Sequence, residues 1–332
     1  MRGKNLLLAV VLVSTQVSAQ SIVETTINGW SSKTSDYVKN HFQASYHGEI
    51  NAVRHDIDSE NKNEQKIKDI KIMHNPTLIY KPNENWQVLA TAEFKFSDQD
   101  SASAGASFPN GFYRGLTTLT RKNILTEESN GIKLDVGVGR RQYNTGREQQ
   151  ADGKFPLSSY GNNRIFTTIS KTKGAHSGSL FVQLLNNDYK KATASTWKNA
   201  LEVIPTLNLQ LTDRLSYMFN DDININSPKF NNTARDVSIT HDMNVAFLNF
   251  QWNDKVGTYY QFKYLHNEGF SKDFQSEDDS FAHYVGVSYA ITAKNAVTAE
   301  AGSDLFHARD GRKLFAKNAV YPELALYLDF AI

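Results

Sequence analysis

Histidine and acidic residues stand close together at two points of the chain where they could perform acid–base chemistry. His55 is followed by Asp56 and Asp58, and His307 is followed by Asp310. A carboxylate that orients an imidazole, beside a second acid, can activate water for amide hydrolysis. Both groups fall in polar segments between apolar ones, where charged side chains are normally solvated. A catalytic cluster at a rim and simple solvation are therefore the two interpretations of these residues.

A histidine–serine pair could serve a second kind of hydrolysis, with serine as nucleophile. His283 and Ser288 share one segment of alternating polarity, but their spacing places them on opposite faces of a strand. The sequence contains no Gly-rich phosphate loop, no zinc-type His-Glu spacing and no G-x-S-x-G elbow. It contains no cysteine, which excludes thiol nucleophiles and thiolate metal sites. We therefore expect no enzymatic activity, no cofactor and no metal ion.

A third group of charged residues alternates with apolar ones along the chain. Polar residues, Glu93 and Lys95 among them, occupy most odd positions of the segment 86–97, and apolar residues occupy the even positions. This period of two predicts a β-strand with two unlike faces. The same pattern recurs from residue 41 to the end of the chain, so most of the chain is predicted to be β-structure.

Strands and connections together predict an all-β fold, an antiparallel up-and-down transmembrane β-barrel of about fourteen strands. Long polar loops and tight turns alternate strictly, and both ends of the series fall on the side of the tight turns, which we assign to the periplasm. Most segments run to about ten residues or more, which is long enough to cross a bilayer when tilted and longer than is usual in a soluble sandwich. The predicted strands are 41–53, 67–80, 86–97, 111–124, 132–141, 164–171, 178–187, 198–211, 215–221, 237–252, 256–267, 280–291, 296–307 and 321–332.

The N-terminus has the features of an export signal. Arg2 and Lys4 precede an apolar run over residues 6–13, and small residues end that region at Ala19. We expect a cleaved signal peptide at 1–19, a periplasmic N-terminal segment at 20–40, either a tail or a short plug, and the barrel at 41–332. The net charge of +1 over 332 residues gives no support for nucleic-acid binding.

The polar faces of the strands are predicted to line a water-filled lumen, with charges of both signs setting its selectivity. Opposite charges on neighbouring strands could equally pair and brace the wall. The longest loop, 143–163, could fold inward and form a constriction through Arg147, Glu148, Asp152 and Lys154. The predicted pore-lining residues are Glu93, Lys95, Lys133, Asp135, Arg141, Glu202 and Lys263.

Several segments resemble the monomeric outer-membrane porins of the OmpG type and the related oligogalacturonate-specific channels. They are PTLNLQLTDRL at 205–215, TARDV at 233–237, and the hairpin around NDK at 253–255 that ends in YLHNEG at 264–269. The resemblance covers mainly 111–270 and implies a fourteen-stranded pore with fairly nonspecific solute passage. Such proteins usually end on an aromatic residue, whereas this chain ends on Ile332. The chain also lacks the Pro-Glu-Phe-Gly-Gly loop of sixteen-stranded trimeric porins.

The sequence thus predicts an outer-membrane porin for passive diffusion of small hydrophilic solutes and ions, exported through the cleaved signal peptide. Its expected partners are outer-membrane lipid and lipopolysaccharide, periplasmic chaperones and the barrel-assembly machinery, but no nucleic acid. A monomer and a homotrimer are both compatible with the sequence. The alternative functions are a surface adhesin or receptor that acts through its long extracellular loops, or a barrel enzyme with a rim active site.

Overall fold

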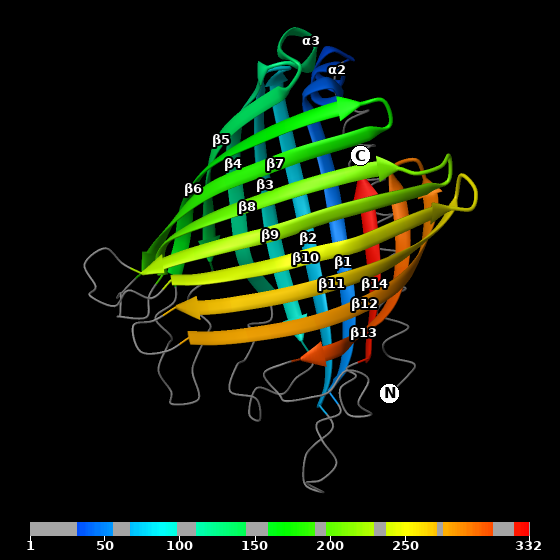
Figure 1. The fold of residues 1–332 in the computed structure, drawn as a ribbon. Helices are drawn as coiled ribbons and strands as arrows, with labels where there is room; N and C mark the ends of the chain where they lie inside the picture. The colour runs from blue at the N-terminus through cyan, green and yellow to red at the C-terminus, as the bar shows by residue number, and fades with distance from the viewer. Residues whose placement is uncertain are drawn as a thin grey trace, which may run out of the picture.

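In the computed structural model the chain forms a closed antiparallel barrel of fourteen strands, each paired with its neighbours in sequence (Figure 1). The structure describes residues 32–55, 67–97, 111–143, 159–189, 197–228, 237–270, 275–307 and 322–331. The predicted fold class is confirmed. The strands are β1 Phe42–His55, β2 Ile67–Asn83, β3 Trp86–Ser97, β4 Gly111–Leu125, β5 Lys133–Tyr143, β6 Ser159–Lys173, β7 His176–Tyr189, β8 Trp197–Gln210, β9 Leu215–Pro228, β10 Val237–Gln251, β11 Val256–Phe270, β12 Gln275–Thr292, β13 Asn295–His307 and β14 Pro322–Ala331.

Short connections join β2 to β3, β4 to β5 and so on around one end of the barrel, at the top of Figure 1. The connection after β4 contains a single helical turn, α3 (Glu127–Asn130), where the sequence predicted only a turn. Thr126 caps this turn by accepting a hydrogen bond from the backbone of Ser129, and Gly131 ends it with a φ of 72°. Glycine adopts that left-handed conformation without steric cost.

Strand β9 is longer than its sequence pattern indicates, because polar residues on one face of the strand resemble a loop. The pattern predicts a strand only over 215–221. Asp222 and Asn224 nevertheless alternate with Ile223 and Ile225, and all four pair with β10. Strands β6 and β12 also begin earlier than predicted.

The described part of the N-terminal segment is a helix, α2 (Ser32–His41), at the turn end of the barrel (Figure 1). Its Tyr37 hydroxyl shares a 2.8 Å hydrogen bond with the hydroxyl of Tyr80, near the end of β2. The chain then enters β1 at Phe42, whose ring stacks on Tyr80 at a centroid distance of 4.6 Å. Among the described helices none is long and apolar enough to cross a membrane. The predicted signal peptide at 1–19 lies outside the described residues.

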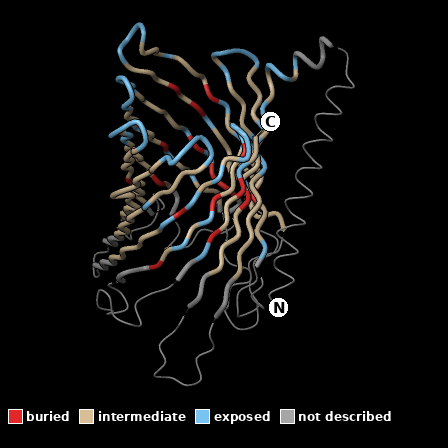
Figure 2. Tube along the Cα trace, turned by 90° about the vertical axis from the view of Figure 1, so that its right-hand side faces the viewer, coloured by how far each residue is buried: buried red, intermediate tan, exposed pale blue. Residues whose placement is uncertain are grey.

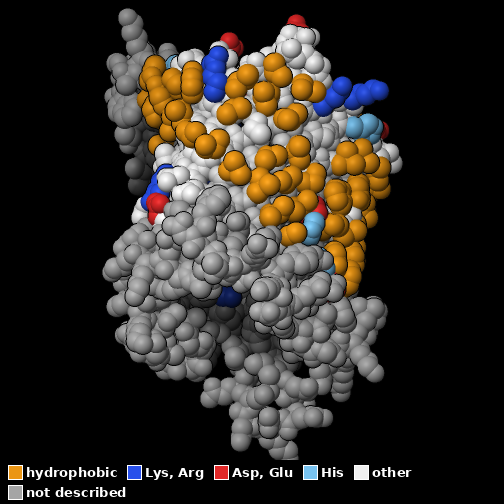
Figure 3. Space-filling view, turned by 60° about the vertical axis from the view of Figure 1, so that its left-hand side comes forward, with side chains coloured by type: hydrophobic (Ala, Val, Ile, Leu, Met, Phe, Trp, Pro, Cys, Tyr) orange, Lys and Arg blue, Asp and Glu red, His pale blue; other side chains and the backbone are white. Residues whose placement is uncertain are grey.

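The two faces of the barrel wall have inverted polarity compared with a soluble protein. Residues that pair across neighbouring strands point to the same side, so the register assigns each position to an inner or an outer face. The outer face carries exposed apolar side chains, including Ile165 at 61% and Leu184 at 59% exposure (Figure 3). Buried residues are scattered along the described strands (Figure 2) and are mostly polar, Glu93 and Asp135 among them. This arrangement suits a wall between lipid and a polar interior.

Aromatic rings cover two glycines of the inner face. A Cβ at Gly286 would lie 2.1 Å from Cζ of Tyr259, and a Cβ at Gly137 would lie 2.2 Å from Cζ of Phe166. Each ring stands directly opposite its glycine on the neighbouring strand. The glycines therefore leave the space that lets an aromatic side chain lie flat against the wall.

We predict that Gly286→Ala lowers the free energy of unfolding by about 1–3 kcal/mol, the usual cost of overpacking. The added methyl group displaces the ring of Tyr259, whose hydroxyl donates a 2.5 Å hydrogen bond to Glu300. Urea titration of the refolded barrel, followed by its heat-dependent gel mobility, measures the change. Gly178→Ala is the control, because the nearest atom to its Cβ, the carbonyl oxygen of Thr206, is 3.7 Å away. Equal midpoints for the two variants would contradict the prediction.

Candidate functional site

The inner face of the barrel gathers the charged residues that the sequence singled out. Every predicted pore-lining residue falls on this face by register: Glu93, Lys95, Lys133, Asp135, Arg141, Glu202 and Lys263. The loop residues proposed for a constriction, Arg147, Glu148, Asp152 and Lys154, lie outside the described residues. The described part of the candidate site is therefore the inner face of the strands.

Glu93 joins two cations on strands β3 and β4. Its carboxylate lies 3.0 Å from Lys95 Nζ and accepts a hydrogen bond from Arg114 Nε. Glu93 is buried, whereas both cations keep part of their surface exposed. The Lys95 ammonium also lies 4.1 Å from the ring centre of Tyr113. The sequence pattern did not identify Arg114, because its contact with Glu93 depends on the register between β3 and β4, which places the two residues opposite each other.

Asp135 has the same role nearer the turn end. Its carboxylate lies 3.2 Å from Lys122 Nζ and 3.6 Å from Lys133 Nζ. It also accepts a 2.8 Å hydrogen bond from the backbone of Asn123, which has a φ of 55°. One buried acid thus fixes two lysines and an unusual backbone conformation, and a net positive charge remains.

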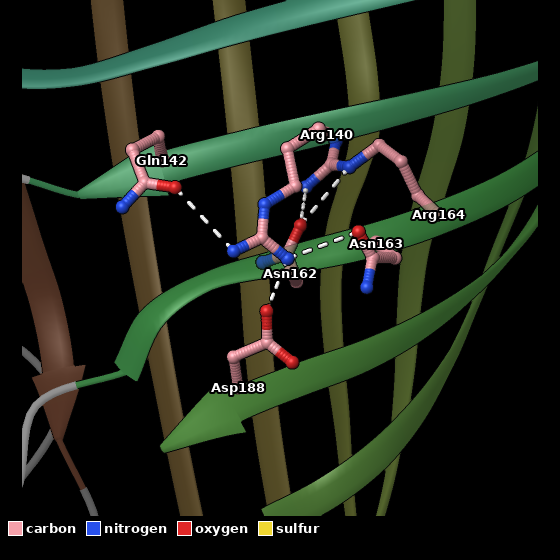
Figure 4. A network of polar contacts seen from close by, with 6 residues as sticks. All are labelled: Arg140, Gln142, Asn162, Asn163, Arg164 and Asp188. Carbon is pink, nitrogen blue, oxygen red and sulfur yellow. Dashed lines mark hydrogen bonds and ion pairs between the residues drawn. The ribbon is translucent and has the colours of Figure 1, made fainter. Parts of the chain in front are cut away.

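Two arginines continue this basic region onto β5 and β6. Arg164 is only 6% exposed and donates through Nε and Nη2 to Oδ1 of Asn162, at 3.1 and 2.8 Å (Figure 4). The buried Nε of Arg141 has no hydrogen-bond partner among the described residues. Glu202 on β8 interacts electrostatically with both arginines across the inner face.

Acidic groups predominate on the rest of the ring, and three of them, Glu49, Asp222 and Glu300, accept hydrogen bonds from neutral donors. Glu300 accepts hydrogen bonds from the hydroxyls of Tyr259, at 2.5 Å, and Tyr327, at 2.9 Å. Asp222 accepts one from the amide of Asn224 at 2.8 Å. These contacts fix the carboxylates without neutralising them.

Two further acids of this side have basic partners. Asp242 pairs with Lys263 Nζ at 3.0 Å, and Asp329 lies 2.7 Å from Nδ1 of His47. The Lys263 ammonium is therefore engaged by an acid of the neighbouring strand β10. This ion pair joins β10 to β11, so some inner-face charges also stabilise the barrel wall.

Charges of opposite sign are separated across the inner face. Strands β3 to β6 carry most of the described cations of this face, and the acids lie mainly on the rest of the ring, on β8 to β10, β13, β14 and β1. The cations of β3 to β6 are Lys95, Arg114, Lys122, Lys133, Arg141 and Arg164, with Glu93 and Asp135 among them, and Lys71 is a further inner-face cation on β2. The acids are Glu49, Glu202, Asp222, Asp242, Glu300 and Asp329, with Lys263 and His47 among them.

The residues considered for catalysis are only partly described. Asp56, Asp58 and Asp310 lie outside the described residues. His283 and Ser288 lie on opposite faces, as the alternation predicts. The structure instead brings His283 Nε2 within 3.2 Å of the hydroxyl of Ser303 on the neighbouring strand. Sequence reasoning missed this outer-face pair, because it depends on the register between β12 and β13.

The fold was compared with known proteins. No protein-family model and no curated protein sequence matches the chain. The structure is similar to that of OmpT with loop L8 deleted, an outer membrane protein of Vibrio cholerae, with a TM-score of 0.50 and 11% identity, covering 88% of this chain and 98% of that chain. OmpT expressed in the outer membrane of Vibrio cholerae gives a TM-score of 0.47 and 11% identity, covering 88% and 97%. An outer membrane channel from Pseudomonas putida F1 gives 0.43 and 9%, covering 88% and 95%.

The sequence led us to expect that the chain is not an enzyme, and this exclusion is wrong. The structure is similar to OmpT, and this similarity, at 11% identity, shows a fold and does not restrict the chain to one class of function. A shared fold carries different functions in different proteins, and enzymatic activity on this scaffold therefore stays open. The chain has the fold of a bacterial outer-membrane β-barrel.

Proposed function

We propose that this protein is an outer-membrane porin through which small hydrophilic solutes and ions diffuse passively. The observation that carries the proposal is the separation of positive and negative charge across the inner face. Ordinary side chains fill the interior of barrels of about eight strands, and a ring of fourteen is wider. A wide interior lined by charged groups favours water over a packed core.

The charge separation also suggests how such a pore selects its solutes. Opposite charges on different parts of the wall create a field within the lumen, and low-dielectric walls concentrate that field. A solute that carries both signs, or a large dipole, can align with this field as it passes. Dipolar and zwitterionic solutes are therefore the favoured class within our proposal.

Membership of the OmpG-type group and the route to the membrane belong to the same proposal. The fourteen strands have the number that the resemblance implies. Export through a signal peptide at 1–19, delivery by periplasmic chaperones and insertion by the barrel-assembly machinery are what an outer-membrane location requires. Lumen-lining roles for Glu93, Lys95 and Lys133 rest on their inner-face positions.

Single-channel recording of the refolded protein in a planar bilayer tests the proposal directly. We expect stable conductance steps of nanosiemens order in molar potassium chloride, because a water-filled lumen of this width conducts hydrated ions. Steps that occur singly would indicate a monomeric pore, and steps grouped in threes would indicate a trimer. A folded barrel that inserts and conducts nothing would contradict the porin function.

We predict that the double substitution Lys95→Glu and Lys133→Glu shifts ion selectivity toward cations. Each change replaces a positive group of the inner face with a negative one, which attracts cations into the lumen. The reversal potential in a salt gradient measures the shift. Lys171→Glu is the matched control, because Lys171 lies on the outer face near the turn end and its substitution leaves the lumen unchanged.

The acidic part of the wall gives a prediction of opposite sign. Glu202→Gln removes a negative group of the inner face, where Glu202 stands opposite Gln183, so the same measurement should shift toward anions. The Gln amide has nearly the same size as the Glu carboxylate, so the substitution changes the charge of the side chain and not its volume. An unchanged reversal potential, or a shift toward cations, would remove Glu202 from the lumen-lining group.

A further inference from the structure

Two neighbouring grooves lie in the outer wall of the barrel, and Arg140 belongs to both. The first groove, of about 540 Å³, lies mainly over small outer-face residues, and Pro76 and Leu78 also line it. The small residues are Ala44, Ala90, Ala92, Gly115 and Thr117. The second groove, of about 550 Å³, runs along larger apolar residues: Val88, Leu119, Val138 and Ile165. Thr117 also lines both grooves and stands opposite Arg140 on the neighbouring strand.

Polar side chains fix the guanidinium of Arg140 between the grooves (Figure 4). Nη1 donates to Oδ1 of Asn163 at 3.0 Å and to the carboxylate of Asp188, and Nη2 donates to Oε1 of Gln142 at 3.4 Å. Both amide oxygens therefore point at the guanidinium. The amide nitrogens of Gln142 and Asn163, together with Nε of Arg140, keep N–H donors for a further acceptor.

The place of Arg140 along its strand matches the edge of the membrane. On β5 the outer-face residues nearer the turn end are apolar: Leu134, Val136 and Val138. The next outer-face residue toward the loop end, Gln142, is polar and exposed. A charge on the lipid face costs about 2–4 kcal/mol at the bilayer midplane and little near the interface. Arg140 thus lies where acyl chains give way to headgroups.

We propose that this site binds one phosphorylated lipid, with phosphate oxygens on Arg140, Gln142 and Asn163 and acyl chains in the two grooves. Charge complementarity selects the occupant, because a guanidinium with planar donors suits a phosphate and flanking apolar grooves suit hydrocarbon. The loop end of the barrel faces the outer leaflet, so the expected lipid is a phosphorylated glycolipid. The site requires the membrane location of our proposed function, but it does not require conduction.

Native mass spectrometry of the full-length barrel in detergent tests the site with bisphosphorylated lipid A. Arg140→Gln should weaken retention of the lipid about tenfold or more, because a charge-assisted contact is lost. Gly115→Leu should weaken it independently by filling the first groove. The added Cβ meets its nearest atoms at 3.5 Å, an ordinary contact distance, and heat-dependent gel mobility checks that the variant barrel folds. Arg121→Gln is the matched control, since Arg121 is another outer-face arginine but lies 5.4 Å from the Trp86 ring, away from both grooves.

Four results would overturn the proposal. Equal retention by wild type and Arg140→Gln, or equal retention of lipid A after removal of its phosphates, would exclude a phosphate site at Arg140. Binding of inorganic phosphate without lipid would make this a site for the free anion. A lipid-free oligomer that Gly115→Leu dissociates would identify the grooves as a contact between copies of the chain. Conductance recorded on the same preparations keeps these results separate from the porin function.

Discussion

The hydrogen-bond ladder between β1 and β14 closes the sheet, and the rest of the structure depends on that closure. The bilayer interior offers no water to unpaired N–H and C=O groups, so an open edge would be costly. The two strands are joined by nine residue pairs, which run from Ser45 with Ala331 to Val53 with Glu323. Once the ring is closed, each side chain has only two environments, and its parity along the strand decides between them.

Acids on the inner face are fixed in two different ways, and the difference maintains the separation of charge. Glu93 and Asp135 each contact two cations, so their side of the wall stays positive after pairing. Glu300 and Asp222 are held by tyrosine hydroxyls and an amide, which leave their charge in place. Hydrogen bonding thus stabilises these side chains without cancelling their charge.

Parity could be predicted from the sequence wherever polar and apolar residues alternate, and it placed Glu93, Lys133 and Glu202 on the inner face. Contacts that depend on the register between neighbouring strands could not be predicted from the sequence. Arg114 of β4 stands opposite Glu93 of β3, and His283 of β12 contacts Ser303 of β13. A period of two describes one strand and carries no information about which residue of its neighbour stands opposite.

The outer arginines show how the same charge is accommodated at the two edges of the apolar band. Arg121 lies near the turn end, where its guanidinium is 5.4 Å from the ring centre of Trp86. Aromatic residues gather at membrane interfaces, and a cation stacked on one can remain among lipid headgroups. Arg140, nearer the loop end, is held by amide and carboxylate oxygens instead. Arg121 also donates to the backbone carbonyl of Asn85 and lines neither groove. Arg140 lies between two apolar grooves and beside two side-chain amides, and it is therefore the arginine at which we expect an anionic headgroup to bind.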